Sequence, residues 1–408
     1  MHFSTITALS AATLVSGAAI KRYGPDDSVP MTKLLPALPL SVFAETEGHT
    51  LTLQEALAGL NITDKIHDIT NGIEDGLEYG ADGIKDGLEH GADGIKDGLK
   101  DGLGNFFKPN MASTNEEDFK VSTASVNVAA ATCSNVRVRT EWDSVSTTDR
   151  QNFVDSLKCL MAKPPSGQFP ASKSRYEDFT ALHQTLTPRV HNSAKFLLWH
   201  RYLVWTWESE LRDSCGLTTT LPWFDETKYA GKFGQSSIFS SQWFGGIGLG
   251  GACVTDGQFA NTAINVGPGP GNQPHCLARN GDAAKTINTG QSMVDACNKR
   301  ETFADMAGCA EGGAHAWGHN GVGAVMQDVY AAPADPVFWL HHGFIDRNFR
   351  IWQNQNPSVR TTTIDGADID GNALTLDTTI NVYSFRPDVK VRDILDTAGQ
   401  TLCYKYNY

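Results

Sequence analysis

The sequence EGGAHAWGHNGVGAVMQDVYAAPADPVFWLHHGFIDRNFRIWQ, residues 311–353, contains four histidines in two groups. His315 and His319 are four residues apart, so on a helix both imidazoles lie on the same face. The adjacent His341 and His342 follow within an apolar stretch that indicates a second helix. Imidazole is the side chain that best suits copper and zinc at neutral pH, so this stretch predicts a metal site between two helices.

A second histidine cluster lies upstream, in DFTALHQTLTPRVHNSAKFLLWHRYLVWTWESEL, residues 178–211. It contains His183, His191 and His200, and the two stretches together hold seven of the chain's 12 histidines. Each cluster can supply three imidazoles from two helices and a loop. Three imidazoles leave a bound metal open to an external ligand, as a catalytic site requires.

Composition does not decide which metal the clusters bind, because zinc and copper both accept imidazole. A surface pair of histidines would explain the single H-x3-H spacing, but two separate triplets in one chain indicate metal binding. The chain has no H-E-x-x-H motif, so a zinc-protease interpretation lacks its general base.

Apolar spacing predicts a mainly α-helical fold. Helices are expected at about residues 174–187 and 194–213. Pro188 is expected to break the first of these, which leaves His191 on the connection. Another helix is expected to begin at Asp335-Pro336, because aspartate caps a helix and proline fits the first turn.

The rest of the core gives weaker signals. Thr-Thr-Asp at residues 147–149 can cap a helix through RQNFVDSLKCLM. Between Cys215 and Cys309 the chain is rich in Gly, Asn and Pro, which predicts long loops. Residues 360–408 alternate apolar and polar positions over short runs. The predicted fold is therefore a helical bundle with long loops and a few short β-strands.

Charge is distributed unevenly along the chain. Residues 23–120 carry 19 acidic and 7 basic side chains, a net charge of −12 out of −13 for the whole chain. Lys21 and Arg22 add +2, so residues 121–408 carry only −3. No basic stripe is present, and an acidic surface repels nucleic acid, so we expect no nucleic-acid partner.

The first 19 residues resemble a secretory signal peptide. An apolar run covers residues 6–20, and Ser16-Gly17-Ala18-Ala19 offers a small-residue cleavage site. The run is too short to span a bilayer, and no later segment is apolar over about 18 residues, so we expect no membrane association. We therefore expect a secreted protein.

The cysteine content agrees with secretion. The chain has eight cysteines, and an even number in a secreted chain suggests disulfides. Eight cysteines allow about 105 pairings, so the sequence leaves the pairing open. None of them forms a C-x-x-C motif, which leaves a zinc ribbon without support.

An acidic segment with internal repeats follows the dibasic pair Lys21-Arg22. GIEDGLEYGAD, GIKDGLEHGAD and GIKDGLKDGLG begin at Gly72, Gly83 and Gly94, a period of 11 residues. The apolar positions form a helical stripe weakened by glycine. The segment is either a propeptide that covers an active site or a solvated spacer. Asn61-Ile62-Thr63 is the one N-glycosylation sequon, and sequons are often unused.

These observations predict three parts. Residues 1–19 are the signal peptide, residues 20–130 are the acidic propeptide or spacer with its linker, and residues 131–408 are the catalytic domain. Oligomeric state is not predicted.

The histidine spacings and DPVFWLHHGFIDR resemble the type-3 copper proteins, which comprise tyrosinases, catechol oxidases and haemocyanins. The resemblance extends over roughly residues 137–406 and looks closest to the short secreted catechol oxidases of filamentous fungi. It implies a helical dicopper domain whose partners are a small phenolic substrate and O2. The activity implied is oxidation of a diphenol to its quinone, with dioxygen reduced to water.

The resemblance also assigns the metal ligands. One copper would be bound by His183, His191 and His200, and the other by His315, His319 and His342. His341 would lie behind the ligands, although the adjacent pair leaves that choice open.

Other positions gain implied roles from the same resemblance. Glu311 matches the carboxylate that orients a water for phenol deprotonation, Phe338 would pack beneath a ligand imidazole, and Val329 would be a small gate residue above the first copper. The alternatives are a solvated glutamate at a helix start and an ordinary core valine. Arg139 and Asp346 match a pair that ties the start of the domain to its last copper helix.

Three features depart from the efficient tyrosinases of the family. Ala316 stands where many of them carry an asparagine that helps the glutamate hold its water, which argues against monophenol hydroxylation. Arg189 replaces a cysteine that forms a thioether with a ligand histidine, so no thioether is expected at His191. Tyr404-x-Tyr406 resembles the motif that closes the catalytic domain, and the shielding C-terminal domain of longer members is missing from this sequence.

The sequence thus predicts a secreted dicopper oxidase that converts o-diphenols and o-aminophenols to o-quinones. One alternative is a tyrosinase that also hydroxylates monophenols. A haemocyanin-like oxygen carrier and a zinc-binding structural protein are alternatives of other classes.

Overall fold

The computed structural model describes residues 45–46, 49–50 and 133–408. The predicted signal peptide, the acidic repeats and the Asn61 sequon lie outside the described residues and stay predictions. The two short strands β1 (Glu45–Thr46) and β2 (His49–Thr50) pair with each other. The long described range begins at Cys133, close to the predicted start of the catalytic domain.

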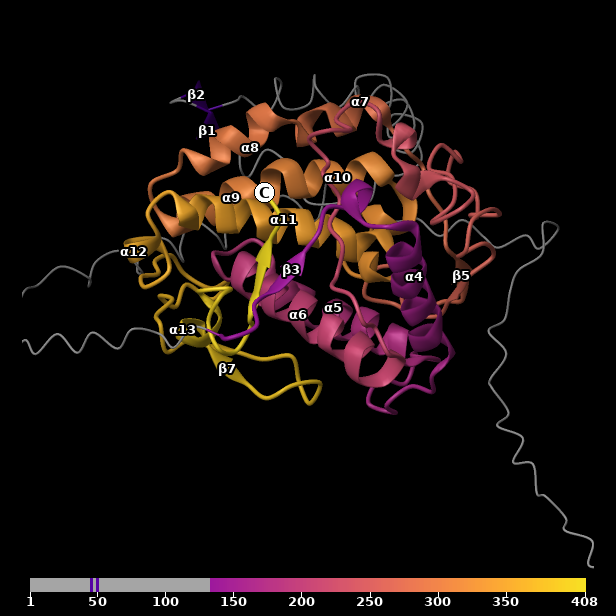
Figure 1. Ribbon diagram of the computed structural model, residues 1–408, viewed down its shortest axis with the longest axis horizontal. Coiled ribbons are helices and arrows are strands. Elements are labelled where there is room, and N and C mark those ends of the chain that lie inside the picture. The colour runs from indigo at the N-terminus through magenta and orange to yellow at the C-terminus, as the bar shows by residue number, and fades with distance from the viewer. Residues whose placement is uncertain (1–44, 47–48, 51–132) are drawn as a thin grey trace, which may run out of the picture. The chain divides into compact units, whose positions relative to one another are not determined.

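Four long helices form the framework of this domain, with α4 at its edge (Figure 1). They are α4 (Thr147–Ala162), α5 (Arg175–Val190), α6 (Lys195–Cys215) and α11 (Val337–Asn354). α6 contacts each of the other three, so it is the central helix. Its Leu198, Leu203 and Val204 are fully buried in the hydrophobic core. The prediction of a mainly helical domain is confirmed.

Side-chain caps and a C-terminal glycine set the ends of these helices. Ser146 accepts the N–H of Asp149 at 3.1 Å, so α4 is capped one residue before the predicted Thr-Thr-Asp. Ser174 likewise accepts the N–H of Glu177 at 3.1 Å at the start of α5. α6 ends at Gly216, whose φ of 67° is a left-handed conformation that glycine adopts without strain.

The prediction that Pro188 breaks α5 is wrong. The helix runs through Pro188 to Val190, and the N–H of His191 donates to the carbonyl of Thr187 at 3.3 Å. Proline removes one helical hydrogen bond, and in the last turn little further helix depends on it. His191 itself adopts an extended conformation after the helix, as predicted.

The start of α11 agrees with its predicted cap. Asp335 Oδ1 accepts the N–H of Val337 at 3.0 Å, and Pro336 precedes the first helical residue. The same carboxylate binds the Arg279 guanidinium at 2.8 and 2.9 Å, with both side chains fully buried. The helix that carries the last two histidines is therefore anchored at its beginning.

Shorter helical segments cover this centre. The short α-helices are α7 (Ala283–Thr286), α8 (Gln291–Asn298), α9 (Phe303–Ala310), α10 (Ala316–Val322), α12 (Pro357–Arg360) and α13 (Val391–Ile394). The 3-10 turns are η2 (Trp142–Ser144), η3 (Phe233–Gln235), η4 (Ser237–Phe239), η5 (Ile287–Thr289), η7 (Ala324–Gln327) and η8 (Ala332–Ala334). A π-helical turn, η6 (Glu311–His315), joins α9 to α10. None of the helices in the described ranges is long and apolar enough to cross a membrane.

The strands of the domain are short, as predicted. They are β3 (Arg137–Arg139), β4 (Ala263–Ile264), β5 (His275–Cys276), β6 (Thr379–Ile380), β7 (Val389–Lys390) and β8 (Tyr404–Tyr406). β4 pairs with β5 and β6 with β7, both antiparallel. β3 and β8 pair in parallel, with Arg137 opposite Tyr404, and so hold the two ends of the domain together.

All eight cysteines form disulfides. The pairs are Cys133–Cys403, Cys159–Cys215, Cys253–Cys276 and Cys297–Cys309. Cys133–Cys403 reinforces the β3–β8 contact between the start and the end of the domain.

A buried charged network joins α6 to α11. Arg201, on α6, donates from Nε to Asp346 Oδ1 of α11 at 2.6 Å. The hydroxyls of Tyr404 and Tyr406 donate to Asp346 Oδ2 at 2.5 and 2.6 Å. Burial by itself raises the pKa of Asp346, but Arg201, Arg139 and the two hydroxyls outweigh it, so the pKa lies below its usual range.

The predicted Arg139–Asp346 pair is present as a longer contact within this network. Arg139 Nη1 lies 3.5 Å from Asp346 Oδ2, whereas its Nη2 donates to Glu208 Oε2 at 2.6 Å. The principal partner of Arg139 is therefore Glu208, and that of Asp346 is Arg201.

Candidate metal centre

The first cluster brings three ring nitrogens together in the core. His183 comes from α5, His191 follows α5 directly and His200 comes from α6. His183 Nε2 lies 3.3 Å from Nε2 of both His191 and His200. The three side chains are buried. Converging imidazole nitrogens in a dry interior form a set of donors that can hold one metal ion.

Backbone carbonyls orient two of these rings. His183 Nδ1 lies 2.8 Å from the carbonyl of Tyr330, and His200 Nδ1 lies 3.0 Å from that of Phe196. An Nδ1–H donated to a carbonyl leaves the lone pair on Nε2, which is the ligand atom. Burial lowers the pKa of His183 to about 3, helped by the neighbouring His191, so the ring is neutral as metal binding requires.

The third ring faces a carboxylate of η6, the turn that also carries His315, although Nδ1 of His191 has no hydrogen-bond partner in the described part of the chain. His191 Nδ1 lies 3.2 Å from Glu311 Oε1, and this oxygen also accepts the N–H of Asn192 at 2.9 Å. Glu311 is 1% exposed, which excludes the alternative of a solvated glutamate at a helix start. Burial raises the pKa of Glu311 to about 8, although the N–H groups of Asn192 and Ser193 act to lower it.

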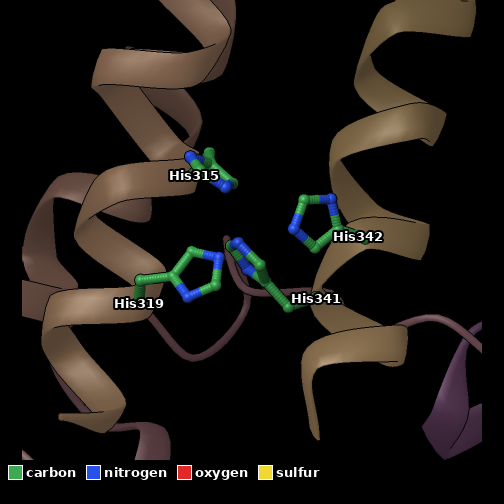
Figure 2. Close-up of side chains that lie close together, drawn as sticks. All are labelled: His315, His319, His341 and His342. Carbon is green, nitrogen blue, oxygen red and sulfur yellow. The ribbon is translucent and has the colours of Figure 1, made fainter. Parts of the chain in front are cut away.

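The second cluster contains four imidazoles (Figure 2). His315 and His319 project from η6 and α10 toward His341 and His342, which project from α11. The ring centroids of His315 and His319 lie 4.5 Å apart, and those of His315 and His342 lie 5.0 Å apart. The structure therefore brings together every histidine that the sequence singled out in this stretch.

A π-helical turn carries the start of this cluster. The sequence predicted one regular helix, but His315 closes η6, where Gly313 has a non-helical ψ of −119°. His315 Nδ1 lies 3.0 Å from the carbonyl of Glu311, and His319 Nδ1 lies 2.6 Å from that of Met326. Both Nδ1 atoms are thereby occupied, which leaves Nε2 for a metal. Turns of this type often occur at functional sites.

The adjacent pair on α11 differs in its partners. His341 Nδ1 lies 2.5 Å from Glu226 Oε1, and both side chains are 1% exposed. The two ring nitrogens of His342 have no hydrogen-bond partner in the described part of the chain. Sequence reasoning missed Glu226, because it lies 115 residues before His341 in a loop that carries no metal motif.

Aromatic contacts connect the two clusters. The rings of His200 and His342 stack with centroids 4.5 Å apart and an interplanar angle of 13°. Phe338 lies 4.2 Å from the His342 ring and 5.3 Å from that of His183, so it supports a ring of each cluster. The two donor sets therefore adjoin and can serve one reaction.

A cavity lies against both clusters. Four histidines line it together with Glu311, Ala316 and Val329. Val329 is half-buried and lines this cavity, so it is not an ordinary core valine. Arg189, in contrast, is 61% exposed and forms an ion pair with Asp370 on the surface, away from this cavity.

Two adjoining imidazole clusters in a helical core are the donor set of a dinuclear metalloprotein. The common central domain of tyrosinase matches residues 173–355 of the chain. Tyrosinase ustQ of Aspergillus flavus is 33% identical over 301 residues, which cover 67% of this chain and 80% of that protein. Tyrosinase P of Aspergillus terreus is 29% identical over 334 residues, which cover 68% of this chain and 94% of that protein.

A solved structure shows the same fold. A mutant polyphenol oxidase from Thermothelomyces thermophila superposes with a TM-score of 0.61 at 26% identity, covering 67% of this chain and 89% of that one. The chain belongs to the tyrosinase family. This is a family of type-3 dicopper enzymes that act on phenolic substrates with O2, and the buried histidine clusters fit two copper ions.

Proposed function

We propose that this protein oxidises o-diphenols, and also o-aminophenols, to o-quinones or their imines, with little hydroxylation of monophenols. Two diphenols lose two electrons and two protons each, and one O2 takes up all four of each to become two waters. The observation that carries the proposal is the convergence of ring nitrogens in two buried clusters, whose ring centroids come within 4.5 Å of each other at His200 and His342.

The ligand assignment is part of the proposal. His183, His191 and His200 would hold one copper, and His315, His319 and His342 would hold the other. When bound, the copper ions supply the means of binding O2 and of passing electrons to it from the phenol. Neutral imidazoles suit both oxidation states of copper.

The chain's own residues would handle the substrate and its proton. Glu311 Oε2 is buried and has no hydrogen-bond partner in the described ranges, so it can take or hold a phenolic proton beside the cavity. Val329 would limit the size of the ring that enters, and Phe338 would keep a ligand of each cluster in place. The apolar surroundings exclude water from the reacting groups.

Ala316 supports a preference for diphenols. It lines the cavity next to His315 and offers no side-chain amide that could position a water with Glu311. A monophenol must lose its proton before hydroxylation, so a site without that second hydrogen-bonding group is poorly equipped for it. A catechol already carries both hydroxyl groups of the o-quinone product, so its oxidation needs no hydroxylation of the ring.

Oxygen uptake and metal content together test this function. We expect copper in the purified chain, rapid O2 consumption with 4-tert-butylcatechol, and slow or no consumption with tyrosol or tyrosine. Brisk hydroxylation without added diphenol would favour a full tyrosinase. An oxygenated absorption band that persists in excess catechol would favour a haemocyanin-like oxygen carrier. Zinc without copper in the purified chain would contradict the proposed function.

We also propose that the protein is secreted and that residues 131–408 are the catalytic domain. Four disulfides support an oxidising compartment, because such bonds are rare in the cytosol. The acidic segment 20–130 is a propeptide or a spacer. Limited proteolysis of the full chain tells these apart, since release of a covering propeptide raises the rate and removal of a spacer leaves it unchanged.

A further inference from the structure

The short segment from Met326 to Tyr330 orients one histidine of each cluster through its backbone. The carbonyl of Met326 lies 2.6 Å from Nδ1 of His319, and the carbonyl of Tyr330 lies 2.8 Å from Nδ1 of His183. A hydrogen bond at Nδ1 fixes the plane of an imidazole and leaves Nε2 for a metal. A shift of this one segment would therefore turn a ring in both clusters.

Asp328 lies at the middle of the segment and is 1% exposed. Its Oδ1 accepts the N–H of Tyr330 at 2.9 Å, which fixes the backbone of the segment itself. Its Oδ2 accepts the N–H of Gly269 at 2.8 Å, which ties the segment to the loop between β4 and β5. A buried oxygen that loses its donor is destabilising, so both bonds hold the segment in one position.

The loop that supplies Gly269 is itself held in place. Gln184, on α5, donates from Nε2 to the carbonyl of Gly269 at 2.8 Å, so this residue is bound through both its N–H and its carbonyl. A Cβ at Gly267 would come within 2.5 Å of the Cβ of Ala331, so the loop packs directly against the chain that follows the segment. Asp328 is therefore bonded to a fixed part of the molecule.

We propose that Asp328 is a positioning residue for the metal centre, because it holds the segment whose carbonyls orient His183 and His319. The proposal rests on the copper chemistry proposed above. Asp328 is outside both donor sets and does not line the cavity, so it would act through the two carbonyls and not on the substrate.

A second buried carboxylate at the same loop provides a matched control. Glu177 accepts the N–H of Asn265, at the beginning of the loop, and that of Lys173, both at 2.7 Å. It therefore holds the loop to α5 and not to the segment. Asp328→Asn and Glu177→Gln each weaken an anchor of the loop, but only Asp328→Asn also frees the segment.

Nuclear magnetic resonance of the metal-free full chain with isotope-labelled histidine tests the proposal directly. We expect Asp328→Asn to shift the Nδ1–H resonances of His183 and His319. The resonances of His200 and His315, whose Nδ1 atoms face carbonyls outside the segment, should stay in place. Unchanged resonances, or equal shifts of all four, would overturn the proposal.

Copper affinity, measured by competition with a chelator, gives a second test. Asp328→Asn should bind both coppers about 10-fold more weakly, as loss of a support behind a ligand typically does, and Glu177→Gln should match the wild type. Equal curves for the two variants would mean that Asp328 holds only the loop, which would overturn the proposal. A wild-type chain without copper would refute the proposed function, whereas the resonances of His183 and His319 would still decide the role of Asp328.

Amide hydrogen exchange in the wild-type chain is a third test and needs no variant to fold. The N–H of Asp370 donates to Asp368 Oδ1 at 3.0 Å in an exposed loop, with the same spacing along the chain as Tyr330 and Asp328. We expect the N–H of Tyr330 to exchange at least about 100-fold more slowly, because it is released only when the segment opens. Equal rates would show that the segment is not held and would overturn the proposal.

Discussion

The two histidine clusters differ in where their supports come from. In the first cluster, His183 is oriented by the carbonyl of Tyr330 and His191 faces the carboxylate of Glu311, and both supports belong to the stretch of the second cluster. In the second cluster, the rings of His315 and His319 are oriented by carbonyls of that same stretch. The first cluster therefore depends on the second more than the second depends on the first.

The largest expected effect comes from removing metal ligands. Loss of ligands from the second cluster should weaken copper binding at the first cluster, whereas loss of a ligand from the first cluster should leave the second copper in place. His200→Ala is expected to lose one copper, keep the other and abolish diphenol oxidation, because both metals are needed. The double variant His315→Ala/His319→Ala should lose the second copper. It should also hold the first copper weakly, because His315 ends the turn η6 that begins with Glu311, and Glu311 faces the ligand His191. Copper content and O2 uptake measure both. Equal retention of the remaining copper in the two variants would contradict the inference that the first cluster depends on the second.

The next largest effect concerns the network that ties the clusters' helices together. Asp346→Asn leaves Arg201 without its buried counter-charge, and removing one partner of such a pair typically costs about 3–5 kcal/mol. Urea unfolding monitored by circular dichroism measures this cost. Asp377→Asn, in the exposed pair with Arg392, is the control and should cost at most about 1 kcal/mol.

The same substitution predicts a pH dependence. The pKa of Asp346 is lowered in the folded protein, so its contribution is complete above the unfolded value of about 3.9 and is lost as pH falls through the folded value. The stability difference between wild type and Asp346→Asn should therefore be constant near neutral pH and shrink in acid below about pH 4. A difference that grows in acid would contradict the ion-pair interpretation.

Glu311→Gln tests the contact that crosses from one cluster to the other. Glutamine can still accept the N–H of Asn192, but it cannot take up or release a proton beside the cavity. We expect diphenol oxidation to fall by about 10–100-fold with the fold intact. Glu177→Gln, at a buried carboxylate bound by Asn265 and away from the clusters, should leave the rate unchanged.

The smallest expected effect concerns the size of the cavity. Val329→Ala removes two methyl groups beside the clusters, which should favour bulky phenols. We expect KM for 4-tert-butylcatechol to fall about threefold relative to KM for catechol, a modest change for methyl-sized differences in a pocket. An equal change in KM for the two substrates would contradict the prediction that Val329 selects substrates by size.

Much of the fold could be predicted from local signals. The spacing of apolar residues predicted α5 and α6 to within three residues of their ends, and Asp335 predicted the start of α11. Helix caps and helix periodicity can be predicted in this way because they depend on neighbouring residues. The passage of α5 through Pro188 and the π turn at Gly313 could not be predicted. α5 needs only two more helical residues after Pro188, which a local rule against proline does not anticipate, and Gly313 lies against Met293 from a separate helix.

The sequence by itself determined that seven histidines fall in two short stretches, and that His315 and His319, four residues apart, project from the same side of the chain. Only the tertiary structure decided how close the clusters lie, which cysteines pair, and which partners orient each ring. Glu226 and Tyr330 reach their histidines from 115 and 147 residues away. Such contacts follow from how the helices pack, and no local pattern in a sequence specifies them.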